Sequence, residues 1–425
     1  MFLFDRPESG ERAILVHLTL KVNQEDLYEL KELAKSAGAE PVHVVTGSRH
    51  RPDPKFFVGT GKLEEIKSEI AFHEADIVLV NHALSPSQER NLEQALGVRV
   101  VDRNGLILDI FALRAQTFEG KLQVELAQLK HLSTRLIRGW THLERQKGGI
   151  GMRGPGETQL ETDRRLLNNR IKQIQKRLQK VDKQRSQGRS KRKKSEISSV
   201  SLVGYTNAGK STLFNRLTNS DIYVADQLFA TLDPTLRSCS LENGTELVLA
   251  DTVGFIRHLP HELIAAFRST LQEASEADLL LHVIDANAED RDDTIYQVDQ
   301  VLEDIDANEI QQLQVFNKID LLENVEPHID RDDTGKPVRI WMSAVTGAGV
   351  DLLFQALAEL FSSTKVKRKC YLQANQGGVR ASLFNYAKII DEQVNECGGW
   401  DLSIEIDKKH LGLLKTVKVE EMECN

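Results

Sequence analysis

The chain has few cysteines and no long apolar run. Its 4 cysteines show neither C-x-x-C spacing nor a nearby histidine cluster, so reduced thiols are expected rather than disulfides or metal ligands. Residues 1–6 lack the basic start and long apolar core of a signal peptide, and no apolar run is long enough to cross a bilayer. The sequence therefore predicts no membrane span and a cytoplasmic location.

Acidic residues outnumber basic residues overall, but not in every part of the chain. The formal net charge is −8, and 40% hydrophobic with 28% charged residues is typical of a globular protein. Residues 121–194 nevertheless hold 21 Lys and Arg against 6 Asp and Glu, a local balance of +15. A basic segment on an acidic protein predicts a localised contact with a polyanion.

A glycine-rich stretch behind the apolar run 200–203 has the pattern G-x-x-x-x-G-K-S/T. Its residues are Gly204-Tyr205-Thr206-Asn207-Ala208-Gly209-Lys210-Ser211-Thr212. The two glycines let backbone N–H groups turn toward a polyphosphate, Lys210 can reach the β- and γ-phosphates, and Ser211 can bind Mg²⁺. The following helix would direct its positive N-terminal end at the same phosphates. The stretch therefore predicts a phosphate-binding loop.

Three later motifs indicate that the nucleotide is a guanine nucleotide. They are Asp251-Thr252-Val253-Gly254, Asn317-Lys318-Ile319-Asp320 and Ser343-Ala344-Val345. Each follows an expected strand, where ligands bind in open α/β sheets. The Asp320 carboxylate can accept N1–H and the exocyclic amine of guanine, whereas adenine offers an acceptor at N1. The backbone of 343–345 would contact the guanine O6, so GTP and GDP should bind better than ATP.

The segment 228–235 is the expected switch that responds to the γ-phosphate. Its residues Phe229-Ala230-Thr231-Leu232-Asp233 are part of the predicted nucleotide site. Thr231 is the expected second Mg²⁺ ligand beside Ser211, with Thr235 as the alternative, and Asp251 would bind the ion through water. Because Gly254 N–H would sense the γ-phosphate, Lys210, Thr231 and Gly254 are the predicted catalytic residues.

One position departs from the common pattern of such sites. Many GTPases have a water-orienting glutamine directly after the D-x-x-G glycine, but this chain has Phe255, which cannot hydrogen-bond a water molecule. Either hydrolysis is slow until another group is supplied, or another residue of the switches orients the water. His258 and His261 are near enough in sequence to be considered, although a surface role at a helix start is favoured for both.

Hydrophobic periodicity predicts a multidomain α/β protein. The expected domains are an N-terminal α/β domain (1–118), a basic helical hairpin with a linker (119–196), a P-loop GTPase domain (197–364) and a small C-terminal α+β domain (365–425). Strands are expected at 13–20, 41–46, 77–80, 236–241, 246–250, 279–284, 313–316 and 338–342, and helices at 24–37 and 62–73. Gly59-Thr60-Gly61-Lys62 imitates a phosphate loop but is interpreted as a helix-entry turn. In the tail we expect a strand from 366, a helix over 379–394 and a last strand at 400–406.

Two apolar stripes at helical spacing predict an antiparallel hairpin. They are Leu122, Leu126, Leu129, Leu136, Trp140 and Leu143, then Leu160, Leu167, Ile171, Ile174, Leu178 and Val181. A capping box at Thr158 and Glu161 should start the second helix, and each arm should extend about 40 Å. The glycine-rich tip at 148–156 contains Arg153. Residues 186–195 are expected to form a flexible hinge. The hairpin is either a basic spacer or a polyanion-binding arm.

With these motifs the chain resembles the HflX family of translational GTPases. Besides the nucleotide motifs, the resemblance rests on 229–235, on Gly154-Pro155-Gly156-Glu157-Thr158-Gln159-Leu160-Glu161 with Asp163-Arg164-Arg165, and on Asp102-Arg103 with 106–111. It implies a GTPase that binds the large (50S) ribosomal subunit and splits or rescues stalled 70S ribosomes, especially under heat stress. The hairpin, through Arg153, Arg164 and Arg165, would contact ribosomal RNA. The free protein is expected to be a monomer.

Two other functional classes remain open from the sequence. A ribosome-assembly GTPase would have the same parts and would associate with immature particles. A signalling switch that controls a protein partner, such as a membrane protease complex, would not need the basic hairpin. Binding that is independent of RNA would favour this second alternative.

Overall fold

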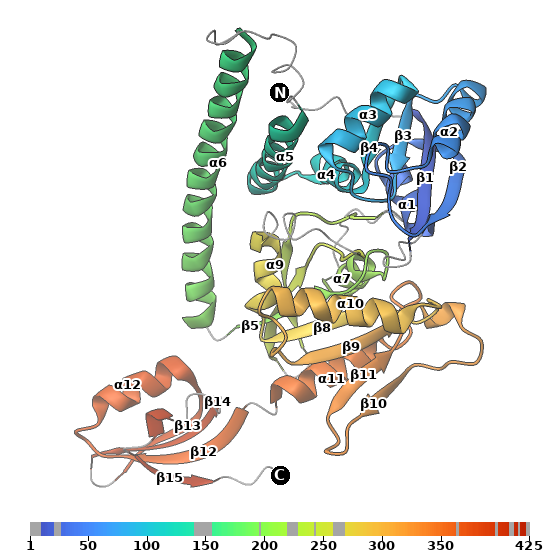
Figure 1. Cartoon of the computed structure of the whole chain (residues 1–425). Helices are drawn as coiled ribbons and strands as arrows, with labels where there is room; N and C mark the ends of the chain where they lie inside the picture. Colours follow the sequence, from blue (N-terminus) through green and yellow to red (C-terminus); the bar gives the residue numbers. More distant parts are fainter. Residues whose placement is uncertain are drawn as a thin grey trace.

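The computed structural model describes residues 10–20, 27–139, 155–194, 197–218, 228–241, 244–257, 268–362, 365–395, 398–407, 412–414 and 417–421. It confirms a multidomain α/β fold (Figure 1). No helix within these ranges combines the length and hydrophobicity that a membrane crossing requires. Predictions on Arg153, His258, His261 and residues 148–154 of the glycine-rich tip fall outside the described ranges.

The N-terminal part is a parallel sheet in the order β2-β1-β3-β4. Its elements are β1 (Arg12–Leu20), α1 (Leu27–Ser36), β2 (Glu40–Arg49), α2 (Thr60–His73), β3 (Ile77–Val80), α3 (Pro86–Leu96), β4 (Arg99–Asp102) and α4 (Arg103–Arg114). The central strands are apolar on both faces because helices cover both sides. The predicted helix-entry turn is confirmed, since α2 begins directly after Gly59.

The helical hairpin joins this sheet to the nucleotide domain. It consists of α5 (Phe118–Gly139) and the 40-residue α6 (Pro155–Lys194). The predicted stripes meet in a small core of Leu122, Leu126, Leu129 and Ile174. In Figure 1 the long α6 runs past α5 and the nucleotide domain. Arg185 of α6 pairs with both neighbours: its guanidinium lies 2.8 Å from Glu119 of α5 and 3.9 Å from Glu273 of the nucleotide domain.

Two local expectations about the hairpin are wrong. The expected hinge at 186–195 is helical as far as Lys194, because lysine, arginine and glutamine favour helix and a single Gly188 does not end it. The second arm starts at Pro155 rather than at the capping box, since proline suits the first turn of a helix.

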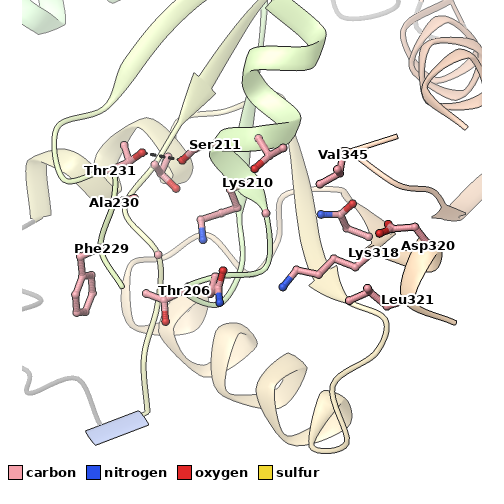
Figure 2. Close-up of a pocket in the computed structure, with 16 residues that line it drawn as sticks. Thr206, Lys210, Ser211, Phe229, Ala230, Thr231, Lys318, Asp320, Leu321 and Val345 are labelled. Atoms are coloured by element: carbon pink, nitrogen blue, oxygen red, sulfur yellow. Dashed lines mark hydrogen bonds between the residues drawn. The ribbon is translucent and has the colours of Figure 1, made fainter. Parts of the chain in front are cut away.

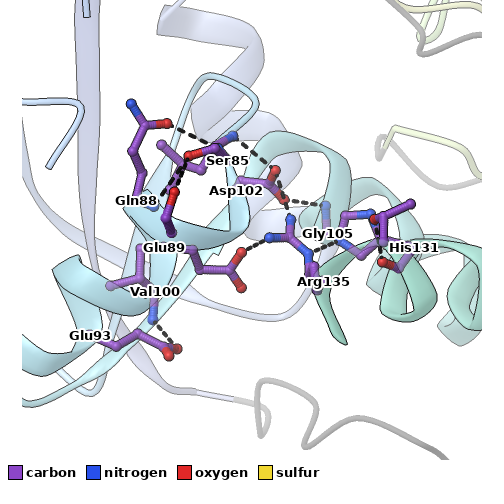
Figure 3. A network of polar contacts seen from close by, with 12 residues as sticks. Ser85, Gln88, Glu89, Glu93, Val100, Asp102, Gly105, His131 and Arg135 are labelled. Carbon is purple, nitrogen blue, oxygen red and sulfur yellow. Dashed lines mark hydrogen bonds and ion pairs between the residues drawn. The ribbon is translucent and has the colours of Figure 1, made fainter. Parts of the chain in front are cut away.

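Buried ion pairs attach α5 to the N-terminal sheet (Figure 3). Arg135 of α5 lies 3.0 Å from the Asp102 carboxylate and also pairs with Glu89 of α3. Asp102 simultaneously caps α4 by accepting from Gly105 N at 2.8 Å. Burial lowers the pKa of Arg135 to about 10, which leaves it protonated at neutral pH. The root of the hairpin is therefore fixed by charge as well as by apolar packing.

The nucleotide domain contains a sheet in the order β10-β11-β9-β8-β5-β7-β6. Its elements are β5 (Ser198–Val203), α7 (Lys210–Thr218), β6 (Thr235–Ser240), β7 (Glu246–Asp251), α9 (Arg268–Ser275), β8 (Leu279–Asp285), α10 (Arg291–Asp304), β9 (Gln312–Asn317), the short helix η1 (Ile319–Leu321), β10 (His328–Arg331), β11 (Pro337–Trp341) and α11 (Val350–Ser362). The β6–β7 pair is antiparallel, as predicted. The antiparallel edge strand β10 was not predicted.

The C-terminal part is an antiparallel sheet in the order β13-β14-β12-β15. Its elements are β12 (Lys365–Leu372), α12 (Gly377–Tyr386), β13 (Ala387–Val394), β14 (Trp400–Asp407) and β15 (Lys418–Glu421). The expected helix over 379–394 is half wrong, because its second half pairs with β14 as a strand. The adjacent β-branched residues Ile389 and Ile390 favour a strand, and Ile389 packs against the core of this sheet.

One apolar core spans the N-terminal sheet and the nucleotide domain. It includes Leu30 and Phe111 from the first and Phe229, Leu232 and Phe255 from the second. The predicted switch segments therefore lie between the two parts. The boundaries of the four-domain division stay a prediction.

Candidate nucleotide site

The phosphate-binding loop lies between β5 and α7. Gly204 and Gly209 have φ angles of 144° and 94°, in the region that favours glycine. A Cβ at Gly204 would collide with the Val283 carbonyl oxygen, and one at Gly209 with the Asn317 amide nitrogen. These two positions therefore require glycine for both conformation and space.

Lys210 is the buried cation of this loop. Its Nζ donates to the carbonyl oxygens of Gly204 at 3.0 Å and Tyr205 at 2.7 Å. Burial lowers its pKa to about 8, while the Asp251 carboxylate acts in the opposite direction. Gly254 approaches so closely that a Cβ there would lie 3.0 Å from this Nζ. The ammonium group thus lies beside the D-x-x-G glycine.

Three oxygen-bearing side chains converge at the start of α7. Ser211 Oγ and Thr231 Oγ1 lie 2.8 Å apart (Figure 2). Each of them also donates to Asp251 Oδ2 at 2.8 Å. The other carboxylate oxygen, Asp251 Oδ1, is buried without a hydrogen-bond partner. Burial raises the pKa of Asp251 above its usual range. Hard oxygen ligands around a buried carboxylate suit Mg²⁺, so these residues fit that ion.

The far end of the cavity is built by residues that follow β9 and β11. Asn317 connects three loops, because its amide donates to Ala208 O at 2.9 Å and its oxygen accepts from Ala344 N at 2.8 Å. Lys318 adopts a φ of 67° and its Nζ lies 2.8 Å from Asp285. This leaves the exposed Asp320 at the cavity wall beside Val345 (Figure 2).

The cavity between these groups has a volume of about 320 Å³. Its lining is Thr206, Asn207, Gly209, Lys210, Ser211, Thr212, Phe229, Ala230, Thr231, Thr252, Gly254, Asn317, Lys318, Asp320, Leu321 and Val345. Of these residues only Leu321 was not predicted. It directly follows the N-K-I-D motif, and that adjacency is the one signal that could have identified it.

Other predicted site residues lie outside the cavity lining. Gly204, Tyr205, Ala208, Asp251, Ser343 and Ala344 stand behind it, whereas Leu232, Val253 and Ile319 are buried in apolar cores. Asp233 instead lies at the start of α5, accepting from the backbone N–H groups of Gln116 and Thr117 at 2.9 Å and from the Thr117 hydroxyl. Thr235 begins β6 opposite Asp251 in register. The spacing of the motifs in the sequence did not show that these residues lie outside the cavity lining.

The side chains around 229 and 255 connect the cavity to the N-terminal part. The Phe229 ring packs edge-on against Phe111, with centroids 4.6 Å apart. Phe255 is 1% exposed, so its ring points into the shared core. Its backbone bonds to the phosphate loop, donating to Gly204 O at 3.1 Å and accepting from Thr206 N at 2.7 Å.

A polar cluster completes this interface, and the sequence did not predict it. Glu29 of α1 accepts from both Arg103 and the Tyr205 hydroxyl. Arg103 also donates to the backbone oxygen of Arg257 at 3.0 Å, and Arg257 N donates to the Tyr205 hydroxyl at 2.9 Å. Desolvation, followed by the Glu29 charge, raises the pKa of Tyr205, so its hydroxyl remains a donor. The phosphate loop and the segment after Gly254 are thereby bonded to the N-terminal part.

A parallel sheet that presents a phosphate loop, a carboxylate–hydroxyl cluster and an N-K-x-D segment at one edge defines a P-loop guanine-nucleotide hydrolase. Three protein-family models match, described as GTP-binding GTPase N-terminal (residues 24–112), GTP-binding GTPase Middle Region (114–192) and 50S ribosome-binding GTPase (199–318). The chain belongs to the HflX family of GTPases, because these models together match most of it and it is highly similar to GTPase HflX of other organisms.

Two relatives and one solved structure illustrate the similarity. The chain is 59% identical to GTPase HflX of Escherichia coli (strain K12) over 95% of both chains. It is 49% identical to GTPase HflX of Caldanaerobacter subterraneus subsp. tengcongensis over 91% of this chain and 89% of that one. The crystal structure of an SsGBP–GDP complex matches with 26% identity and a TM-score of 0.48, covering 82% of this chain and 98% of that one.

Proposed function

We propose that this GTPase binds the large ribosomal subunit and splits or rescues stalled 70S ribosomes in the cytoplasm, especially under heat stress. The observation that carries the proposal is the attachment of a basic hairpin to the same N-terminal part that packs on both switch segments. A γ-phosphate-dependent movement of the switches would therefore reach an arm suited to ribosomal RNA. The family-model description "50S ribosome-binding GTPase" supports the choice of partner.

The proposed nucleotide contacts follow the geometry of the cavity. Asp320 would accept two guanine donors, Asn317 would brace the loops, Lys318 would cover the base, and the 343–345 backbone would contact O6. Lys210 would move from its carbonyl partners to the β- and γ-phosphates. Thr231 and Gly254 would hold the switches around the γ-phosphate.

Ser211 and Thr231 are the proposed direct Mg²⁺ ligands, and Asp251 would contact the ion through water. The ion would neutralise charge on the β- and γ-phosphates. The protein's own contribution is to hold two hydroxyls and one buried carboxylate in place before the nucleotide arrives. The close approach of the three oxygens and the unpartnered Asp251 Oδ1 support this assignment.

The proposed RNA contacts are Arg153, Arg164 and Arg165, near the tip of the hairpin. Arg165 is exposed and Arg164 half-buried on the first turns of α6. Arg170, by contrast, is held by two bonds to Glu125 of α5 at 2.6 and 3.0 Å and so braces the hairpin. Phosphate contacts release counterions, so affinity through the tip should fall steeply with salt.

The test is co-sedimentation of the monomeric free protein with ribosomes and a non-hydrolysable GTP analogue, together with light scattering of 70S particles. We expect binding and conversion to subunits. Changing Arg153, Arg164 and Arg165 to Gln should weaken binding at least tenfold and flatten its salt dependence, without changing GTP affinity. The matched control changes the exposed shaft residues Lys172, Lys176 and Arg177 to Gln, which removes the same charge away from the tip.

Other outcomes would identify the alternatives. Equal losses from tip and shaft variants would reduce the hairpin to a general basic surface. Association with immature particles but not with 70S ribosomes would indicate an assembly GTPase. Binding to a protein partner after nuclease treatment, without ribosome binding, would indicate a signalling switch.

The burial of Phe255 makes a further test of this function. Since its ring lies in the shared core, no side chain at this position orients the attacking water, and turnover of the free protein should be slow. Purified large subunits should raise turnover by ordering the switches or supplying a polar group. Fast turnover that is indifferent to the subunit would contradict the proposal.

Phe255→Ala should cost little intrinsic turnover compared with Lys210→Ala. It should nevertheless cost about 3–5 kcal/mol of unfolding free energy, because it leaves a cavity in a buried core. Turnover and thermal unfolding of this variant separate the two effects.

A further inference from the structure

Two histidines and a glutamate come together on the N-terminal sheet, away from the nucleotide cavity. His43 lies on the edge strand β2, while Glu69 and His73 lie one turn apart on α2. One ligand atom from each residue can be chosen so that all three lie within 4.8 Å of one another. Among the residues that the structure describes, no other group of three His, Cys, Asp or Glu side chains meets this condition.

We propose that His43, Glu69 and His73 form a binding site for a zinc-class transition-metal ion. The two imidazoles and one carboxylate are the ligand types that Zn²⁺ takes in three-ligand sites with an open fourth position. Imidazole ligands disfavour Mg²⁺ and Ca²⁺, which prefer oxygen. The proposal is independent of the nucleotide site, because none of these residues lines that cavity.

One of the two measured distances matches a tetrahedral ion and the other is slightly longer. Glu69 Oε2 lies 3.4 Å from His73 Nε2 and 3.8 Å from His43 Nε2. Ligand bonds of about 2.0–2.2 Å at tetrahedral angles would separate two ligand atoms by roughly 3.3–3.5 Å. Both measured distances are too long for a strong hydrogen bond. Small side-chain rotations would bring all three atoms to one ion.

The surroundings hold the ligands in place and leave access to solvent. The His43 and His73 rings are stacked, with centroids 5.2 Å apart and planes inclined by 24°, and the exposed Phe72 ring contacts His73 edge-on. The three side chains are between 22% and 38% exposed, so an ion can reach them. His73 is in the last turn of α2, where the helix dipole favours a cation.

Such a site would tie the edge strand β2 to α2. Because the ligands come from two elements that must be folded to meet, metal binding would stabilise the folded N-terminal part and raise its unfolding temperature. The open fourth position would face solvent and could take water. This role does not depend on GTP hydrolysis.

The experiment uses the full chain without an affinity tag, saturated with Mg²⁺ and GDP so that the nucleotide site is occupied. Calorimetry with Zn²⁺ alone should show one site of micromolar affinity. Co²⁺ should give a visible absorption spectrum typical of four-coordinate nitrogen and oxygen ligands. Saturating Zn²⁺ should raise the unfolding temperature of the N-terminal part by about 3–6 °C.

Matched variants make the result specific. The double variant His43→Ala, His73→Ala should lose at least 100-fold in Zn²⁺ affinity together with the cobalt spectrum. Glu69→Gln, which keeps the side-chain volume, should lose at least tenfold. The control is His328→Ala, whose imidazole lies 3.5 Å from Asp330 but belongs to no three-ligand group in the described ranges, and it should bind like the unmodified protein.

Equal zinc uptake by the unmodified protein and the double variant would overturn the proposal, as would binding only at millimolar zinc. GDP affinity and far-ultraviolet circular dichroism establish that each variant is folded. If the double variant does not fold, unchanged zinc affinity in Glu69→Gln would be enough to reject the site.

Discussion

The two halves of the nucleotide cavity are anchored differently. The half near Asp320 is held by bonds within the nucleotide domain, chiefly those of Asn317 to Ala208 and Ala344. The half near Thr231 is bordered by segments that pack on the N-terminal part, through Phe229 and the Tyr205 hydroxyl. The first half, which we propose to bind the base, is therefore held independently of the N-terminal part. A movement of the second half, which we propose to bind the phosphates, would reach the N-terminal part.

The largest effect should come from removing the phosphate contacts themselves. Lys210→Ala removes the buried cation and Ser211→Ala removes a proposed metal ligand, so each should lower GTP turnover at least about 1,000-fold. Measured release of phosphate with saturating Mg²⁺ checks this. Protection of the N-terminal part in hydrogen exchange would show that the remainder stays folded. Near-normal turnover in either variant would mean that the phosphate loop is misplaced.

A change confined to the other half should alter which base is bound. In Asp320→Asn the amide oxygen can still accept one guanine donor, but the amide nitrogen faces the guanine amine. GTP affinity should therefore fall up to about 100-fold, as expected for the loss of one hydrogen bond to a charged group. Xanthine nucleotide, which has an oxygen at that position, should gain relative affinity. Calorimetry with both nucleotides makes the measurement, and unchanged GTP affinity would remove Asp320 from the site.

The coupling between the phosphate half and the N-terminal part should have a moderate effect. Tyr205→Phe removes one hydroxyl that bonds to Glu29 and Arg257, so stimulation of turnover by large subunits should fall about fivefold, as expected for about 1 kcal/mol. GDP affinity should stay within about twofold, since backbone groups and Lys210 bind the phosphates.

The control for this coupling is Tyr296→Phe, which removes a hydroxyl bonded to Gln300 within α10. It should leave stimulation unchanged. Equal effects of the two variants, or a Tyr205→Phe protein that is stimulated normally, would mean that the interface does not transmit the phosphate signal.

The smallest effect should appear on varying pH. Burial lowers the pKa of Lys210 to about 8 in the free protein, and bound phosphates would raise it again. Nucleotide affinity should therefore be constant below pH 7 and fall as pH rises through 8, by about fourfold between pH 7 and 8.5. Lys210→Arg, whose guanidinium stays protonated, should bind with no such pH dependence. A flat profile in the unmodified protein would contradict a lowered pKa.

The sequence by itself determined the phosphate loop and its partner motifs. Gly204, Gly209 and Lys210 are specified by backbone conformation and by contacts a few residues apart. The remaining motifs follow strands of one sheet, and the carboxyl ends of parallel strands meet at the same edge. Such local rules are visible in spacing and periodicity. The apolar stripes of the hairpin were predictable for the same reason.

Only the tertiary structure decided how the switches meet the N-terminal part. Asp233 accepts from Thr117, which lies 116 positions earlier, and the Glu29–Tyr205 bond spans 176 positions. No periodicity links residues so far apart, because their contact depends on how the two sheets pack on one another. The same limit applies to β13, where pairing with β14 outweighs a helical pattern. It also applies to His43, Glu69 and His73, which come together only because α2 packs beside β2.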